Sequence, residues 1–266
     1  MEWYAAYLAL GAFVGFFAGL FGIGGGLVLV PVLSMLFEAQ HLSSQNNLHL
    51  LALGTSMAAI ILSAASSAYT HHSHSAVNFT VVRTTTPGLL LGTALGALFA
   101  SYISTIYLTV FFVLFVYFAA LQMLFDLKPK AVRQLPGLSG MTLVGVGIGT
   151  ISSLVSIGGG ALSVPFMLRH NIPLKQAIGT SAALGLPIAI GGTIGYIATG
   201  LSVNTLPSNT LGFVYLPALF WVALASMVTA PPGARAAHRL PLNLLRRGFA
   251  VLLLVLATRM LLKVLG

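Results

Sequence analysis

The sequence predicts an all-α membrane protein built from two inverted repeats, with about eight to ten membrane segments. The composition predicts the membrane class, because 58% of the 266 residues are hydrophobic and only 6% are charged. In soluble domains about one quarter of the residues are charged. The repeats are indicated by F-G-I-G-G-G-L-V-L-V-P at residues 21–31, which recurs as V-S-I-G-G-G-A-L-S-V-P at residues 155–165.

Three consecutive glycines interrupt an apolar run in each of these stretches. Each glycine disfavours helix by about 1 kcal/mol relative to alanine, so we expect the helix to break there. A proline follows, and because it lacks an N–H group, we expect the irregular backbone to extend almost to it. Non-helical backbone at membrane depth persists only where it is packed in protein or lines a polar cavity, which makes each break a candidate binding site. The residues concerned are Gly24, Gly25, Gly26 and Pro31 in the first half, and Gly158, Gly159, Gly160 and Pro165 in the second.

The first half divides into apolar segments separated by short polar stretches. M-E-W-Y at the start lacks a basic n-region, so we expect a retained membrane segment there. Gly11, Gly15 and Gly19 of this segment are four residues apart, which allows another helix to approach closely. His71 to His74 could form a metal or proton site, but without carboxylate or cysteine companions we expect a solvated loop. The expected helices are residues 3–21, 27–37, 48–69, 87–102 and 105–125.

The second half repeats this order. G-T-S at residues 54–56 recurs at 179–181, an offset of 125, and the glycine motif recurs at an offset of 134. Gly96 and Met123 correspond to Gly233 and Met260 at an offset of 137. We therefore expect a first repeat at residues 1–125, a hydrophilic linker at 126–136 and a second repeat at 137–266. The expected helices of the second half are residues 138–156, 161–168, 176–199, 213–230 and 244–265.

The twelve lysines and arginines predict how the segments cross the membrane. If each broken segment crossed once, six basic residues would lie on each side. If the chain reverses at each break, ten lie on one side and only Arg259 and Lys263 on the other. Basic residues gather on the cytoplasmic side, so the reversing arrangement is favoured, with a cytoplasmic linker and both termini outside the cytoplasm. The sequence leaves open whether the short segments after the breaks cross fully or turn back partway.

The breaks have the chemistry of an anion site. A helix N-terminus carries about half a positive charge and donates unpaired N–H groups, and inverted repeats would bring two such termini toward the membrane midplane. The alternative for the glycine motifs is a tight helix crossing without a ligand. The alternative for the nearby hydroxyls is a hydrogen bond to the carbonyl four residues earlier in the same helix. The hydroxyls that could add donors are those of Thr55, Ser56, Ser156, Ser163, Thr180 and Ser181.

Other classes of function lack support in the sequence. The absence of cysteine excludes disulfides, thiolate metal sites and thiol nucleophiles. The three carboxylates, of Glu2, Glu38 and Asp126, lie at the edges of apolar runs, so no acidic proton relay is visible. No catalytic motif is present, and we expect neither an enzyme nor a bound metal or cofactor. The net charge of +9 is explained by membrane topology, and we expect no nucleic-acid partner.

The chain resembles the sulfite exporter TauE/SafE family of bacterial inner-membrane proteins over essentially its full length. The resemblance rests on the two glycine and proline motifs, the G-T-S triplets after them and R-x-x-x-R-L-P at residues 235–241. It implies transport, usually outward, of sulfite, an organosulfonate or a related sulfur-containing anion. Because Phe21-Gly22 in the first motif replaces Val155-Ser156 in the second, the two half-sites need not be equivalent.

These observations together predict an exporter of a small sulfur-containing anion that works by alternating access between the two breaks. An anion that leaves an inside-negative cell gains about 2.3 kcal/mol per charge per 100 mV, so no coupling ion is required. Proton- or sodium-coupled uptake and a non-transporting membrane scaffold are the alternatives. The expected partners are the anion and the lipid bilayer, and a homodimer is one assembly that the sequence allows.

Overall fold

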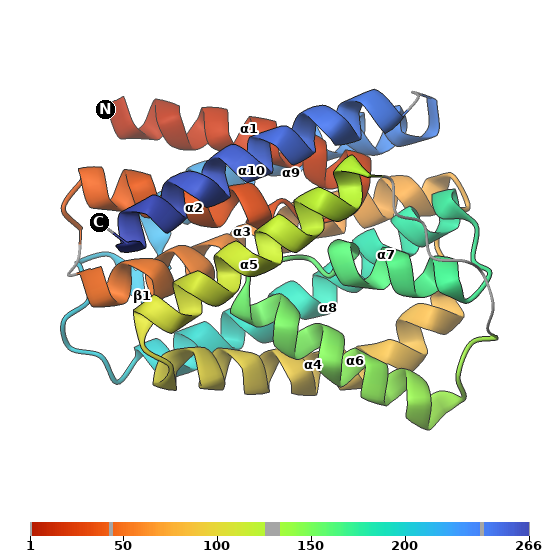
Figure 1. Cartoon of the computed structure of the whole chain (residues 1–266), viewed down its shortest axis with the longest axis horizontal. Helices are drawn as coiled ribbons and strands as arrows, with labels where there is room; N and C mark the ends of the chain where they lie inside the picture. The colour runs from red at the N-terminus through yellow and green to blue at the C-terminus, as the bar shows by residue number, and fades with distance from the viewer. Residues whose placement is uncertain (1, 43–44, 126–133, 240–241, 266) are drawn as a thin grey trace.

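The computed structural model describes residues 2–42, 45–125, 134–239 and 242–265 (Figure 1). Within these ranges the chain forms ten α-helices and one small β-hairpin, and five of the helices are long and apolar enough to cross a membrane. The predicted all-α membrane class is confirmed. The elements are α1 (Glu2–Phe21), α2 (Gly26–Ala39), α3 (Gln45–Ser73), α4 (Phe79–Tyr102), α5 (Thr105–Leu124), α6 (Leu138–Leu154), α7 (Gly160–Arg169), α8 (Leu174–Gly200), β1 (Thr210–Leu211), β2 (Val214–Tyr215), α9 (Leu216–Arg239) and α10 (Leu242–Leu265).

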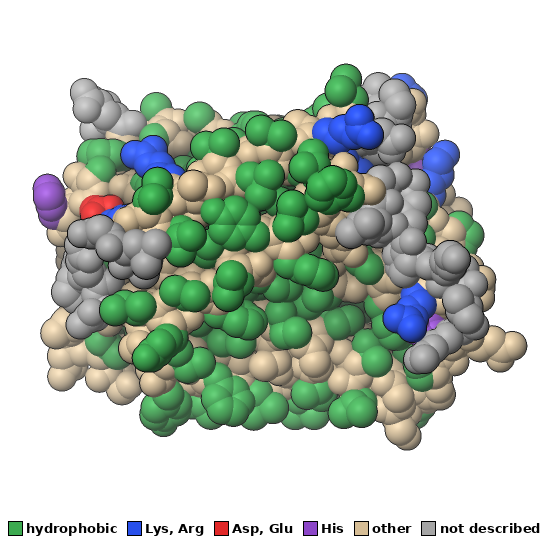
Figure 2. Space-filling view, in the orientation of Figure 1, with side chains coloured by type: hydrophobic (Ala, Val, Ile, Leu, Met, Phe, Trp, Pro, Cys, Tyr) green, Lys and Arg blue, Asp and Glu red, His purple; other side chains and the backbone are tan. Residues whose placement is uncertain are grey.

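The outer surface of the helix bundle is apolar. Leu91 of α4 is 60% exposed and Leu114 of α5 is 62% exposed, and both helices present further leucines and phenylalanines outward. Figure 2 shows these hydrophobic side chains as a broad band between the two ends of the molecule. A band of this extent is unfavourable in water and suits contact with lipid. The chain is therefore a multi-pass membrane protein.

Glycines bring α1 and α9 into close contact, as the sequence predicted. A Cβ added at Gly11 would lie 2.4 Å from the carbonyl oxygen of Val222, and one at Gly15 would lie 2.5 Å from that of Ser226. The same arrangement occurs between α6 and α4, where a Cβ at Gly145 would lie 2.5 Å from the carbonyl oxygen of Thr85. Gly11 and Gly145 are separated by the offset of 134 found for the glycine motif. The inverted repeat stays a prediction, and these paired contacts support it.

The chain turns back between α1 and α2, and again between α6 and α7 (Figure 1). The expectation that irregular backbone extends almost to Pro31 and Pro165 is wrong, since both prolines lie inside helices α2 and α7. Gly25 and Gly159 have φ angles of 78° and 80°, a left-handed conformation that completes each turn. Each short helix then begins at the next residue.

Three helices extend at one end by four residues or more beyond the predicted bounds. Helix α3 continues to Ser73, so His71 is buried in a helix and not in a solvated loop. Helix α4 begins at Phe79 and passes through Pro87, because Asn78 caps its start and accepts a hydrogen bond from the N–H of Val81 at 3.3 Å. Helix α9 likewise runs through two prolines to Arg239. Packing against neighbouring helices holds these turns despite the N–H groups that proline lacks.

Basic residues gather at the end of the molecule that carries the α3–α4, α7–α8 and α9–α10 connections, on the right in Figures 1 and 2. We call this the basic end. The other end carries Arg259 and Lys263, and the Lys263 ammonium pairs with the Glu38 carboxylate there. Lys128, Lys130 and Arg133 of the predicted linker lie outside the described residues. The described residues at the basic end are Arg83, Arg169, Lys175, Arg235, Arg239, Arg246 and Arg247.

Candidate functional site

The two glycine stretches touch each other through their main chains. The N–H of Gly158 donates a hydrogen bond to the carbonyl oxygen of Ile23 at 3.0 Å. A Cβ added at Gly24 would lie 2.6 Å from the nitrogen of Gly158, and one at Gly160 would lie 2.3 Å from the carbonyl oxygen of Gly22. No side chain fits into such spacings, which explains why glycines occupy this contact.

Each glycine stretch also starts a helix next to this contact. The carbonyl oxygen of Gly25 accepts from the N–H of Leu29 at 3.1 Å, and that of Gly159 accepts from the N–H of Ser163 at 2.7 Å. The N–H groups of Val28 and Leu162 bond to the same two carbonyl oxygens, at 3.1 and 3.0 Å. The N–H groups of the first two residues of each helix lie ahead of these bonds and have no acceptor in their own helix. Together with the helix dipole they make each start electropositive. Helix α2 runs away from the basic end, so its first N–H groups point back toward that end (Figure 1).

A small hollow, about large enough for one water molecule, adjoins the contact between the glycine stretches. Gly24 and Gly158 are the predicted site residues that line it. Ser67 of α3 also lines it, and its hydroxyl is buried without a hydrogen-bond partner. A buried donor that lacks a partner is costly unless something else binds it. The full lining is Ala18, Gly22, Gly24, Ser63, Ala64, Ser67, Gly158, Ala182 and Gly185.

Sequence reasoning missed the two serines of α3. Ser63 and Ser67 are four residues apart and therefore share one face of the helix. Ser63 donates to the carbonyl of Ile60 at 3.1 Å, which leaves Ser67 as the free hydroxyl at the hollow. The four-residue spacing of small polar residues was a usable signal. A search for repeated motifs could not find it, because the offset of 125 places Ile188 and Gly192 at the corresponding positions of α8.

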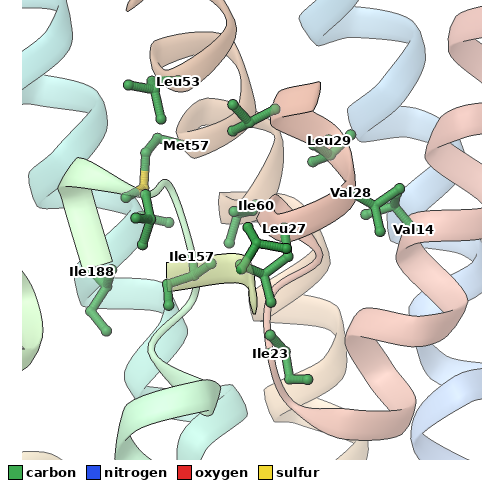
Figure 3. Packing of buried hydrophobic residues seen from close by; sticks show 14 of the residues in the cluster. Val14, Ile23, Leu27, Val28, Leu29, Leu53, Met57, Ile60, Ile157 and Ile188 are labelled. Atoms are coloured by element: carbon green, nitrogen blue, oxygen red, sulfur yellow. The ribbon is translucent and has the colours of Figure 1, made fainter. Parts of the chain in front are cut away.

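Positions that correspond to part of this lining in the other half of the molecule carry larger apolar side chains. The offset of 125 relates Ser63 to Ile188, and it relates Ala182 and Gly185 of the lining to Met57 and Ile60. Met57, Ile60 and Ile188 are all fully buried (Figure 3). The hollow is lined by the parts of α3 and α8 nearer the basic end. The hollow therefore lies toward the basic end, whereas Met57, Ile60 and Ile188 place large apolar side chains at the corresponding positions on the other side of the glycine contact.

The predicted threonines connect helices to the segments beside them. The Thr55 hydroxyl oxygen accepts from the N–H of Tyr215 in β2 at 2.9 Å. The Thr180 hydroxyl oxygen accepts from the N–H of Asn78, just before α4, at the same distance. Neither threonine lines the hollow. These hydrogen bonds hold α3 next to β2, and α8 next to the start of α4.

The predicted serines also lie outside the hollow lining. Ser156 donates to the carbonyl of Leu53 at 3.0 Å. The Ser181 hydroxyl lies 2.8 Å from the carbonyl oxygen of Ile178 in its own helix and 3.2 Å from that of Gly22. Ser56 and Ser163 are buried, and neither hydroxyl has a partner. The two halves therefore use their hydroxyls differently, as the exchange of Gly22 for Ser156 suggested.

Comparison with known proteins identifies the family. The sulfite exporter TauE/SafE family model matches residues 7–260. A probable membrane transporter protein of Haemophilus influenzae is 37% identical over 96% of this chain and 97% of its own length. Others from Bacillus subtilis and Methanocaldococcus jannaschii are 28% and 26% identical, over 86% and 84% of this chain and 88% and 80% of their own. No solved structure matches significantly. The chain is thus a membrane transporter and belongs to the sulfite exporter TauE/SafE family.

Proposed function

We propose that this transporter exports a small sulfur-containing anion, sulfite or an organosulfonate, through the hollow beside the glycine contact. The observation that carries the proposal is the lining of the hollow: main chain from both glycine stretches, and the unpartnered hydroxyl of Ser67. The electropositive start of α2 faces the same region. In this structure the hollow is only about large enough for one water molecule, so its walls move apart when an anion enters.

The proposed transport cycle rests on the difference in packing between the two sides of the contact that joins the glycine stretches. In this structure the hollow is on the basic-end side, and Met57, Ile60 and Ile188 pack the other side. We take residues 1–125 and 137–266 as inverted repeats joined by a linker at 126–136. Rocking one repeat against the other then closes the hollow on the basic-end side and opens an equivalent space on the other side. The apolar residues then separate, and the walls around Ser63 and Ser67 close. This gives alternating access to one central site.

The direction of transport follows from the charge distribution. The basic end carries most of the described arginines and lysines, so it faces the cytoplasm of a bacterial inner membrane and both termini lie outside. The structure then has its hollow on the cytoplasmic side, where an anion from the cell enters once the walls of the hollow move apart. The membrane potential favours export by about 2.3 kcal/mol per charge per 100 mV. A homodimer stays a prediction, which mass photometry of the purified protein can check.

Flux of radiolabelled sulfite in proteoliposomes tests the proposal. Imposing a membrane potential at equal pH and equal sodium should drive sulfite toward the positive side. Flux that is independent of the membrane potential but depends on an imposed proton or sodium gradient would indicate coupled uptake and contradict uncoupled export. No flux above that of protein-free liposomes, from protein that is folded and monodisperse, would favour a scaffold.

A further inference from the structure

His71 lies directly beyond the hollow. It is four residues after Ser67 on α3, which places it one helical turn, about 6 Å along the axis, closer to the basic end. Its side chain is fully buried. Its Nε2 atom lies 3.1 Å from the carbonyl oxygen of Gly19 in α1, and its Nδ1 atom lies 3.1 Å from Nε2 of His238 in α9. His71 therefore joins three helices at the edge of the hollow.

The partners of His71 determine where its proton is. A carbonyl oxygen only accepts, so Nε2 of His71 carries a hydrogen and donates it to Gly19. In the neutral ring Nδ1 then has a lone pair and accepts from Nε2–H of His238. Nδ1 of His238 is left without a hydrogen. The pair can thus take up one proton at that atom and pass the His238 Nε2 hydrogen to Nδ1 of His71, with both hydrogen bonds preserved.

We propose that the His71–His238 pair is a proton-binding site whose occupation strengthens anion binding in the hollow. The uptake step consumes one proton from water and leaves His71 as the cation and His238 neutral with its hydrogen on Nδ1. The proposal rests on the proposed function for the identity of the hollow as an anion site. It requires no pH gradient, because the proton acts by its charge at the site.

Two features of the site favour the cation on His71. Gly19 is in the last turn of α1, where the helix dipole is negative, and a charged donor makes a stronger bond to its carbonyl. A positive charge one turn from Ser67 also attracts an anion in the hollow. Burial opposes the charge most, because it removes the ring from water. Two groups add to this: His74 stacks on His238 with ring centroids 4.7 Å apart, and Lys175 of α8 acts on His238 electrostatically. These groups keep the pair from holding its proton at every pH.

A route for the proton exists along the same cluster. His74 is exposed and His238 is half-buried, whereas His71 is fully buried. Nδ1 of His74 donates to the carbonyl of Thr70 at 2.8 Å, which fixes this ring beside His238. The exposure thus falls stepwise from the basic end toward the hollow, so a proton can enter from the cytoplasmic side.

The second half of the molecule offers a matched comparison. At the offset of 125 from His71 stands Tyr196, whose hydroxyl donates to the carbonyl of Ser153 at 2.8 Å. Ser153 itself is at the offset of 134 from Gly19. The same bond between a long helix and a broken one is therefore made twice, once by a titratable ring and once by a phenol. His71→Tyr should keep the bond to Gly19 and remove the proton site.

Nuclear magnetic resonance of protein with ¹⁵N-labelled histidines tests the proton site without any anion. Between about pH 4 and pH 7 the rings of His71 and His238 should titrate together, with shared nitrogen shifts, and His71→Tyr should abolish the coupled change at His238. Assignment uses the single variants His71→Tyr and His238→Gln. Independent titration of the two rings, or a His71 ring that stays neutral over the range, would overturn the proposal.

Binding of methanesulfonate, whose charge is constant over this range, tests the link to the hollow. Affinity should be about tenfold higher at the acidic end than at the alkaline end, and His71→Tyr should remove most of this difference. Tyr196→Phe and the exposed neighbour His72→Gln should keep it. A pH dependence that survives in His71→Tyr would overturn the link. Absence of binding by methanesulfonate and sulfite at every pH would refute the proposed function, while the resonance titration would still decide the proton site.

Discussion

Gly26→Ala should separate the two glycine stretches. A Cβ at Gly26 would lie 1.5 Å from the carbonyl oxygen of Ser156, where ordinary contact begins at 3.4 Å. The conformation of Gly26 is helical and alanine adopts it freely, so the whole effect comes from this steric clash. Relief of the clash requires the segments to move apart by 3.4 − 1.5 = 1.9 Å.

The cost of that movement can be estimated from the contacts that it breaks. Separation of this size breaks the 3.0 Å bond from the Gly158 N–H to the Ile23 carbonyl. Leaving these buried groups unpaired costs about 1–3 kcal/mol, and overpacking a tight core costs about 1–3 kcal/mol more. We therefore expect a loss of about 2–6 kcal/mol in the free energy of unfolding. At about 2 °C per kcal/mol or more, the Tm should fall by at least about 4 °C.

Thermal unfolding of purified protein in detergent measures this loss. Gly147→Ala is the matched control, because Gly147 lies in helix α6 and a Cβ there meets nothing within 4 Å. The control should keep the wild-type Tm or raise it slightly, since alanine favours helix. Wild-type stability and sulfite flux in Gly26→Ala would show that the two main chains do not touch, and would refute the reasoning.

Three further predictions concern Ser67 and Tyr196. Ser67→Ala removes a buried hydroxyl without a partner, so the free energy of unfolding should not fall, whereas anion affinity should fall about tenfold or more. The control Ser66→Ala removes a hydrogen bond to the Met227 carbonyl and should leave anion affinity unchanged in the same binding assay. Ser67→Cys introduces a thiol into a chain without cysteine, and an impermeant thiosulfonate should label it from the basic end. Adding Met57→Ala should slow that labelling by weakening the packed side. Tyr196→Phe should lower the free energy of unfolding by about 1 kcal/mol or more, measured by thermal melts, and an unchanged Tm would contradict the bond to Ser153.

The sequence was sufficient to predict the membrane class and the place of the glycine stretches, because both depend on local chemistry. Hydrophobic runs reveal helices in a bilayer, and three glycines stop a helix irrespective of what surrounds them. The prediction failed at Pro87 and Pro31, where the chain remains helical. Local rules end a helix at a proline, whereas packing in the folded bundle compensates for one missing hydrogen bond.

The candidate site was only partly predictable. Gly24 and Gly158 line the hollow as expected, but the hydroxyls of Thr55 and Thr180 bond to main-chain N–H groups. Which face of a helix points to a cavity depends on how it packs, and a repeated motif marks structural contacts as readily as binding ones. Ser67 departs from the repeat, since Gly192 stands at its counterpart. The hollow lies where the two halves differ, which a search for similarity passes over.

Anomalous diffraction from crystals grown with selenite, a heavier analogue of sulfite, tests the central claim most directly. The account predicts one strong selenium peak in the hollow, within hydrogen-bonding distance of the Ser67 hydroxyl and of main-chain N–H groups at the glycine contact. A protein that transports selenite but binds it elsewhere, with the hollow empty, would contradict the account.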